Sequence, residues 1–382
     1  MRLNKLLVLF SMLLLPTLFL GQEKKEGIRV NYKDGILIKT SDSTFSMKLN
    51  TRLQFLFLYS DRDFLDARER TPSFVLRRVR IEWSGNAFYY WLKYGIQLTM
   101  EGTSIAVRDY WVDFTKDPIF QVRAGQFKVP FNREFVTSTA VLQFVDRSLA
   151  NTEFFLGRDI GVALHGNIGG DKLEYSAGAF NGAAKNRPNQ DRALMYVGRA
   201  TLNLMGKATY AQGDLENSEK PVLAISAAMA LLPNFKAAFD GIDDRLVLST
   251  AVRQTGSDTS DVRQVTADVV FKSKGLSFEG EYHYRNINPT ETNLSSRTAN
   301  GWRLQAGYFL APRKFEVALR FSRVDPNIDA DNDARQEITP AFNYFISGHR
   351  LKLQADFSFL KQQVQSEDES DYRGRVQLQF YF

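Results

Sequence analysis

The chain has 382 residues, no cysteine, and 49 basic against 43 acidic side chains, which gives a formal net charge of +6. The lack of cysteine excludes disulfides, thiol chemistry and a lipidated cysteine. Arg2 and Lys5 fall in the leader described next, so 47 basic side chains remain against 43 acidic ones, a near balance that gives no argument for nucleic acid binding.

Residues 1–21 are typical of a secretory signal peptide. Arg2 and Lys5 precede the short apolar run 6–15, Pro16 interrupts that run, and Gly21 offers a small residue before a cleavage point. The run is too short to span a membrane, and no later apolar stretch reaches the length of about 18 residues of a transmembrane helix. We expect residues 22–44 to form a periplasmic lead-in, with residues 31–43 as a short hairpin or a lip at the inlet of the barrel.

From residue 45 to the end, the sequence alternates between apolar and polar side chains. A period of two predicts β-strands, because successive side chains of a strand point to opposite faces. The alternation defines sixteen predicted strands, at 45–59, 74–83, 90–100, 106–115, 119–128, 158–168, 171–181, 193–205, 221–231, 264–272, 276–285, 302–310, 315–321, 335–346, 351–359 and 372–382.

The lengths of these segments separate two all-β folds, a soluble sandwich and a transmembrane barrel. Several segments exceed about ten residues, the length that crosses a bilayer, whereas ordinary strands have about five or six. Tight turns alternate with long polar links at 60–72, 129–156, 182–192, 232–261, 288–299, 324–334 and 361–371, with a short link at 101–105 and a long link at 206–219 as exceptions. An even number of strands also closes a sheet without an edge. We therefore predict a transmembrane antiparallel β-barrel of about 16 strands, over residues 45–382.

The last segment, 372-YRGRVQLQFYF-382, shows which face meets which solvent. Gly374, Val376, Leu378, Phe380 and Phe382 share one face, which we expect to contact lipid. Arg373, Arg375, Gln377, Gln379 and Tyr381 share the other, which we expect to line a wet lumen. A C-terminal aromatic residue on such a strand resembles the sorting signal of Gram-negative outer-membrane proteins.

The stretch 124-AGQFKVPFNREFVTSTAVLQFVDRSLANTEFFLGRDIGVALHG-166 resembles the phosphate-selective porin O and P family. The similarity lies in AGQFK-x-PF at the end of a strand, in the D-R-S-L-A segment and in G-R-D-I-G-V at the start of the next strand. This resemblance implies a sixteen-stranded Gram-negative outer-membrane porin, often a homotrimer, with the third external loop folded into the lumen. Residues 129–156 occupy that loop's place in the strand count, so we take them as the constriction loop.

The alternation also assigns charged side chains to the lumen. The candidate pore-lining cations are Lys48, Arg52, Arg78, Arg80, Lys93, Arg123, Arg199, Arg303 and Arg320, and Lys352, Arg373 and Arg375 share the inward face. Eight acidic residues point the same way: Glu82, Asp113, Asp159, Glu279, Glu281, Glu316, Glu337 and Asp356. Rings of Arg and Lys favour anions in a pore, and a guanidinium suits phosphate. Alternatively, pairs such as Arg80 with Glu82, or Arg320 with Glu316, only stiffen the wall.

The constriction loop carries charges of both signs. Lys128, Arg133 and Arg147 are its cations, and Glu134, Asp146 and Glu153 are its anions. This balance leaves selectivity for phosphate open. No metal-ligand spacing, phosphate-binding glycine loop or Ser/His/acid set stands out, so we expect no cofactor and no enzymatic activity.

These observations predict a passive pore for small anionic solutes. The more specific form of this prediction names phosphate or polyphosphate as the solute. Two alternatives stay open. One is a general small-solute porin, and the other is a barrel that acts as a receptor or structural anchor. The expected partners are outer-membrane lipid and small inorganic anions.

Overall fold

The computed structural model describes residues 27–32, 34–64, 67–101, 104–189, 193–237, 246–364 and 367–382. The expected signal peptide, residues 1–21, lies outside these ranges. Within them, no helix is long and apolar enough to cross a membrane.

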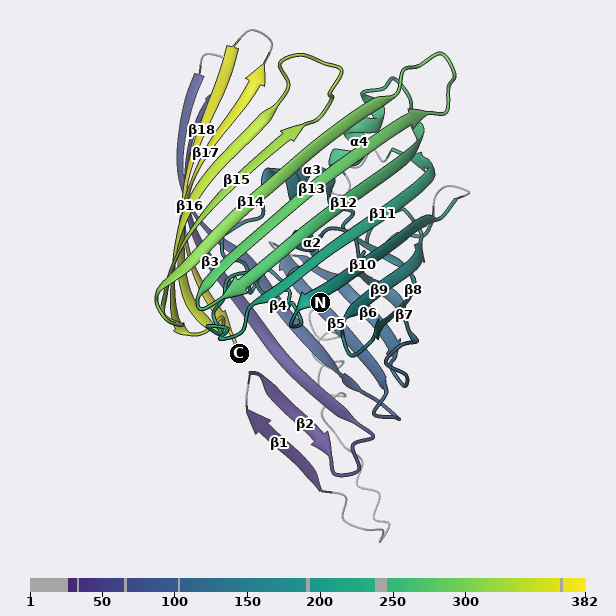
Figure 1. Cartoon of the computed structure of the whole chain (residues 1–382), viewed down its shortest axis with the longest axis vertical. Coiled ribbons are helices and arrows are strands. Elements are labelled where there is room, and N and C mark those ends of the chain that lie inside the picture. The colour runs from purple at the N-terminus through teal and green to yellow at the C-terminus, as the bar shows by residue number, and fades with distance from the viewer. Residues whose placement is uncertain are drawn as a thin grey trace, which may run out of the picture.

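Sixteen consecutive strands of the described chain form one closed antiparallel barrel, which confirms the predicted fold class (Figure 1). Each strand pairs with the next, and β18 pairs with β3 to close the sheet. The strands are β3 (Ser46–Phe64), β4 (Ala67–Asn86), β5 (Leu92–Glu101), β6 (Ser104–Phe114), β7 (Gln121–Lys128), β8 (Arg158–Ile168), β9 (Leu173–Phe180), β10 (Met195–Met205), β11 (Val222–Lys236), β12 (Thr259–Ser273), β13 (Leu276–Pro289), β14 (Arg297–Ala311), β15 (Phe315–Asp325), β16 (Arg335–Ser347), β17 (Leu351–Val364) and β18 (Glu367–Tyr381).

The two faces of the barrel wall differ as the alternation predicts. In β18, Arg375, Gln377 and Gln379 point inward and are buried, whereas Val376 and Phe380 are exposed on the outer face. The backbone of Phe382 exchanges two hydrogen bonds with Thr51 of β3, at 2.6 and 3.0 Å. The final residue therefore continues the sheet across the closing seam instead of fraying.

Short turns gather at one end of the barrel, called the lower end here, and longer links at the upper end (Figure 1). Two expected links are shorter than predicted, because β3 and β4 continue to Phe64 and Ala67, and β17 and β18 to Val364 and Glu367. In these two hairpins polar residues extend the ladder, so the apolar alternation alone underestimates the strands.

A separate hairpin precedes the barrel and extends below it (Figure 1). It consists of β1 (Ile28–Tyr32) and β2 (Ile36–Thr40), and β2 also pairs with the start of β3. The expected hairpin at 31–43 is thus present, displaced by about three residues toward the N-terminus.

Three segments fold into the barrel. The loop between β7 and β8 enters from the upper end and carries α2 (Arg133–Val136) and α3 (Leu149–Phe154). The link between β11 and β12 carries α4 (Leu246–Arg253), which contacts α3. The link between β10 and β11, residues 206–221, enters from the lower end, where Gln212 N donates to Val141 O at 3.0 Å. The residues of this unusually long lower link therefore occupy part of the lumen.

Apolar side chains of the constriction loop fix it against the wall. Phe131 and Leu156 join a buried cluster with residues of β10, β11, β12 and α4. Phe154 packs with Ala299 and Val324, and Phe144 with Ala318 and Ala341. Burying each such side chain contributes about 1.5–3 kcal/mol, so the loop is a packed part of the barrel.

Candidate functional site

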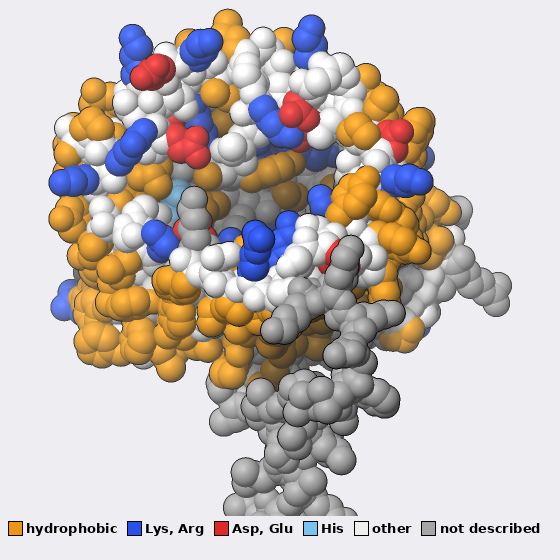
Figure 2. Space-filling view, turned by 90° about the horizontal axis from the view of Figure 1, so that it is seen from below, with side chains coloured by type: hydrophobic (Ala, Val, Ile, Leu, Met, Phe, Trp, Pro, Cys, Tyr) orange, Lys and Arg blue, Asp and Glu red, His pale blue; other side chains and the backbone are white. Residues whose placement is uncertain are grey.

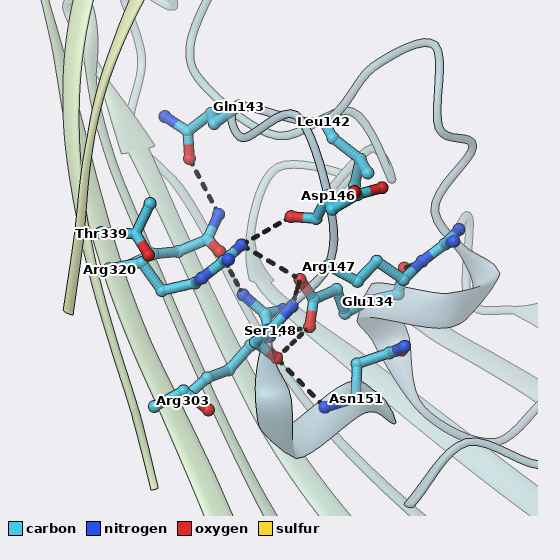
Figure 3. A network of polar contacts seen from close by, with 12 residues as sticks. Glu134, Leu142, Gln143, Asp146, Arg147, Ser148, Asn151, Arg303, Arg320 and Thr339 are labelled. Carbon is cyan, nitrogen blue, oxygen red and sulfur yellow. Dashed lines mark hydrogen bonds and ion pairs between the residues drawn. The ribbon is translucent and has the colours of Figure 1, made fainter. Parts of the chain in front are cut away.

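The constriction loop is attached to the barrel wall by its acidic residues. Glu134, at the start of α2, receives hydrogen bonds from the backbone N–H and hydroxyl of Ser148, at 3.0 and 2.5 Å. The guanidinium of Arg303 lies 3.3 Å from Glu134, and that of Arg320 lies 3.8 Å away. Figure 3 shows both arginines reaching from the wall toward Glu134 and Ser148. This carboxylate is neutralised by wall cations and is not available to a solute.

The second attachment lies around Asp146. Its carboxylate is 3.1 Å from Arg77, 2.8 Å from Arg78 and 3.6 Å from Arg375. Burial opposes the charge, yet these three guanidinium groups hold the pKa of Asp146 well below its usual value. Nearby, Gln143 donates to Ser277 and Glu316, at 2.9 and 2.8 Å.

The third attachment is Glu153 in α3. One of its oxygens pairs with Arg285, and the other lies 2.5 Å from Arg335. Burial raises the pKa of Glu153, but the two arginines outweigh it, so the net pKa is lowered. All three acidic residues of the loop are therefore bound to arginines.

The cations of the loop have different partners. The ammonium of Lys128 donates to the carbonyls of Phe135, Val136 and Thr137 at 2.9–3.0 Å. Arg147 donates to the carbonyls of Glu134, Phe135 and Thr137 at 2.8–3.2 Å. In the described chain, neither has a carboxylate within 4 Å. Burial and neighbouring cations, Arg78 first among them, lower the pKa of Arg147 to about 9, so it stays charged at neutral pH.

Arg80 of β4 and Arg158 of β8 complete this group, here called the α2 cations: Arg80, Lys128, Arg147 and Arg158. Arg158 forms a double hydrogen bond with Asp109, at 2.8 and 3.0 Å. Arg80 donates to the hydroxyl of Thr139 at 3.2 Å and has no acidic partner within the described ranges. Its Nε atom is buried and has no hydrogen-bond partner. The α2 cations thus combine four basic side chains with one bonded carboxylate.

A cavity of about 490 Å³ lies between the constriction loop and strands β4–β10. Arg80, Lys128 and Arg158 line it beside Pro130 and Val136 of the loop, and Trp111, Arg123 and Tyr175 line it elsewhere. Seen from the lower end, the barrel has a central hollow with Lys and Arg side chains around it, interspersed with Asp and Glu side chains (Figure 2). Hydrophobic side chains cover the outer wall. The loop therefore leaves an open cavity on one side of the lumen, here called the passage.

The other predicted pore-lining cations occupy varied places. Arg303 and Arg320 are buried beneath the loop, where Arg303 also pairs with Glu279 and Glu281 and Arg320 with Glu337. Arg199 pairs with Asp268 at 2.6 Å. Arg52 pairs with Glu82, so Glu82 is not the partner of Arg80, and Arg78 pairs with Asp146. Lys48 is half-buried and Lys93 is exposed near the lower end.

Arg133 of α2 turns away from the α2 cations. Its guanidinium donates to the carbonyl of Thr209 and lies 3.5 Å from Glu279. It also lies over the ring of Tyr210, 5.0 Å from its centroid. Arg133 therefore joins the constriction loop to the lower link.

Sequence reasoning missed several residues of this region. Two β-bulges place Arg77 and Arg108 outside the pairing ladder, because Arg78 faces Gln54 while Leu76 faces Phe55, and Asp109 faces Gln97 while Val107 faces Leu98. A bulge redirects side chains, and Arg77 reaches Asp146 although alternation assigns it to the outer face. Arg158 was missed because it stands at the first position of its strand. Consecutive charges within a strand, as in 77–78 and 108–109, are a signal that could reveal such bulges.

Within the described residues, no group of three or more His, Cys, Asp or Glu side chains has the arrangement of a metal site. The charged groups that line the cavity are guanidinium and ammonium groups together with the carboxylates of Glu82, Asp109 and Glu174.

Comparisons with known proteins agree with this architecture. The family model for phosphate-selective porin O and P matches residues 47–382. An uncharacterized protein of Aquifex aeolicus (strain VF5) is 23% identical over 383 residues, which cover 88% of this chain and 86% of that protein.

Solved structures show the same fold at low identity. The outer membrane channel DcaP of Acinetobacter baumannii has a TM-score of 0.60 at 13% identity, covering 88% of this chain and 97% of DcaP. In-vitro folded OmpT, an outer membrane protein of Vibrio cholerae, has a TM-score of 0.58 at 10% identity, with 88% and 97% coverage. A trimer form of OmpT aligns with a TM-score of 0.55 at 10% identity over 88% of this chain and 99% of that one.

Proposed function

Because the chain belongs to the phosphate-selective porin O and P family and is thus an outer-membrane porin, we propose that it conducts small anions by passive diffusion. The path is the passage between the constriction loop and strands β4–β10. The α2 cations raise the local concentration of anions there, and the loop sets the bore. Diffusion needs no catalytic group, and we propose no enzymatic activity.

The observation that carries this proposal is the unequal pairing of the loop's charges. Glu134, Asp146 and Glu153 are bound to wall arginines, whereas Lys128 and Arg147 donate to backbone carbonyls and have no carboxylate within 4 Å in the described part of the chain. The loop sequence has equal numbers of acidic and basic residues, but its acidic residues are neutralised by the wall and do not face the passage. A solute near the α2 cations meets a positive surface, which favours anions.

More specifically, we propose that inorganic phosphate is one of the anions that the passage binds and conducts. The side chain of Arg80 lines the cavity and has no acidic partner among the described residues, and a guanidinium matches the oxygens of phosphate. A general small-solute porin would use the same passage without holding the anion.

The test is the reversal potential of the refolded protein in a planar bilayer under a KCl gradient, followed by titration with phosphate. We expect a potential that favours chloride and a current that falls as phosphate is added. A potential near zero without phosphate block would show a general porin. Channels that never open would favour the receptor or anchor alternative.

A charge variant makes this test specific. We expect Arg80→Gln to reduce the chloride-to-potassium permeability ratio by at least about fourfold, since one charge at about 5 Å in water is worth about 0.8 kcal/mol. The matched control is Lys314→Gln, which removes an exposed cation in a lower turn outside the passage. An equal ratio in both variants would remove Arg80 from the selective path.

We also propose a homotrimer, supported by the family and by the trimer form of OmpT. Light scattering of the detergent-solubilised protein, corrected for bound detergent, would measure the mass. A monomer mass at all protein concentrations would contradict it.

A further inference from the structure

Below the α2 cations, the passage contains a flat structure made of Trp111, Arg123 and Gly95. The Trp111 ring lies against Gly95 of β5, where a Cβ atom would be 2.4 Å from the ring. The guanidinium carbon of Arg123 is 4.4 Å from the centroid of the Trp111 ring. Because any side chain at position 95 would collide with the ring, the glycine lets the indole lie against the wall. Arg123 covers the indole, and we call this arrangement the Trp111 shelf.

Hydrogen bonds fix the guanidinium on the shelf. The Nε and Nη2 atoms of Arg123 both donate to Oδ2 of Asp113, at 3.0 and 2.7 Å. The other oxygen, Oδ1, is 2.9 Å from Nε2 of His165. The Nη1 atom of Arg123 has no partner among the described residues. The guanidinium is therefore held in one orientation and keeps one free donor.

Arg123 differs from the arginines under the constriction loop in its accessibility. Its side chain is 33% exposed and lines the cavity, whereas that of Arg303 is 0% exposed. Asp113 already neutralises much of its charge, so the shelf adds little to the general attraction of anions. Its distinctive property is a planar guanidinium that lies on the Trp111 ring, is also 5.6 Å from the centroid of the Phe127 ring, and stays partly exposed to the cavity.

The shelf is separate from the α2 cations. Arg123 precedes Lys128 by five positions in β7, which is roughly 16 Å along a strand. Tyr175 also lines this part of the cavity. An anion that leaves the α2 cations toward the lower end therefore meets an aromatic surface before it leaves the barrel.

We propose that the Trp111 shelf binds carboxylates or phosphates that are attached to a flat aromatic ring. The solute's ring stacks on the exposed part of the guanidinium, offset so that its anionic group lies beside the unpartnered Nη1 atom of Arg123. A guanidinium stacks on aromatic rings through its face and attracts oxyanions at its edge. This inference rests on the proposed anion conduction and names a class of organic anion that the passage retains.

Benzoate and cyclohexanecarboxylate test the proposal, because they have the same charge and similar size and only benzoate is planar. Each is titrated against the chloride current of the refolded protein in a planar bilayer. We expect benzoate to block half of the current at a concentration about fivefold lower, a typical gain for one stacked cation–π contact. Equal blocking concentrations in a chloride-selective channel would overturn the shelf and leave the proposed function intact. A cation-selective channel would overturn both.

Two variants place the effect on the shelf. Arg123→Lys keeps the charge but removes the plane, and Trp111→Leu removes the ring beneath it. In each, the ratio of the two blocking concentrations should fall toward one. The control is Trp91→Leu, which alters a tryptophan stacked on Tyr89 at the lower rim and should keep the fivefold ratio. If Trp111→Leu does not refold, Arg123→Lys decides alone, and an unchanged ratio there would overturn the proposal.

Discussion

The two sides of the lumen use the same residue type for different purposes. On strands β13–β18, arginines are buried and paired with acidic residues of the loop and wall, as Arg303 is with Glu134, Glu279 and Glu281. On strands β4–β10, Arg77 and Arg78 also bind the loop through Asp146, but Arg80 has no acidic partner among the described residues and Arg123 remains partly exposed. An arginine that points into a barrel therefore says little about selectivity until its partner is known. The arginines that bind the loop hold it in place, and Arg80 and Arg123 meet the solute.

The largest expected loss of stability comes from removing the buried cation Arg303, which holds the constriction loop against strands β13–β18. In Arg303→Met, three buried carboxylates lose their shared cation, and removing one partner of a buried ion pair costs about 3–5 kcal/mol. We expect a lower urea midpoint for the refolded protein and, where the barrel still forms, a larger and noisier conductance. The control Arg323→Met changes an exposed arginine of β15 and should match the native protein. A native midpoint in Arg303→Met would contradict the division into two sides.

A smaller loss of stability should follow when one methyl group is added on the same side of the lumen, at Gly307 of β14. In Gly307→Ala, the new Cβ would lie 2.2 Å from Nε2 of Gln143, so Gln143 must give up its bonds to Ser277 and Glu316. We expect a loss of about 1–3 kcal/mol from overpacking and a lower conductance, because the loop moves toward the passage. Gly198→Ala is the control, since nothing lies within 4 Å of its added Cβ. Equal conductance in the two variants would show that the loop is not displaced.

The smallest expected effect is the dependence of stability on pH through Glu153. Its pKa in the folded state is lowered from the usual 4.5, so its contribution is present above that value and is lost as the pH falls through the folded pKa. We expect the urea midpoint to fall between about pH 5 and pH 3, and to fall less in Glu153→Gln. Glu219→Gln, at an exposed position of the lower link, should keep the native pH profile. Identical profiles in all three proteins would exclude Glu153 as the cause.

The sequence predicts the wall of this barrel better than its interior. Alternation finds all sixteen strands because one face meets an apolar solvent at every second residue, as Val376 and Phe380 illustrate. It also places Arg303 and Arg80 on the same inward face. The alternation cannot tell which of the two arginines is paired, because the partners of Arg303 include Glu134, from a loop that is distant in the sequence. Ion pairs between distant segments leave no periodic pattern in the sequence.

The bulges show a second limit. One extra residue between paired positions changes the face of its neighbours, and only the partner strand shows where that residue stands. Arg77 illustrates this, since it bonds to Asp146 despite its place in the alternation. The lower link had a signal in its unusual length, but length alone does not say that residues 206–221 turn into the lumen.

The meeting of that lower link with the constriction loop has a mechanical consequence. The two segments enter from opposite ends and are joined where Gln212 donates to Val141, where Gln143 donates to Gln212, and where Arg133 bonds to Thr209. Neither segment can swing out of the barrel without breaking the bonds of the other. Their local opening free energies are therefore coupled. The constriction loop and the lower link should therefore open together. Hydrogen exchange should give similar opening free energies for the amides of both segments.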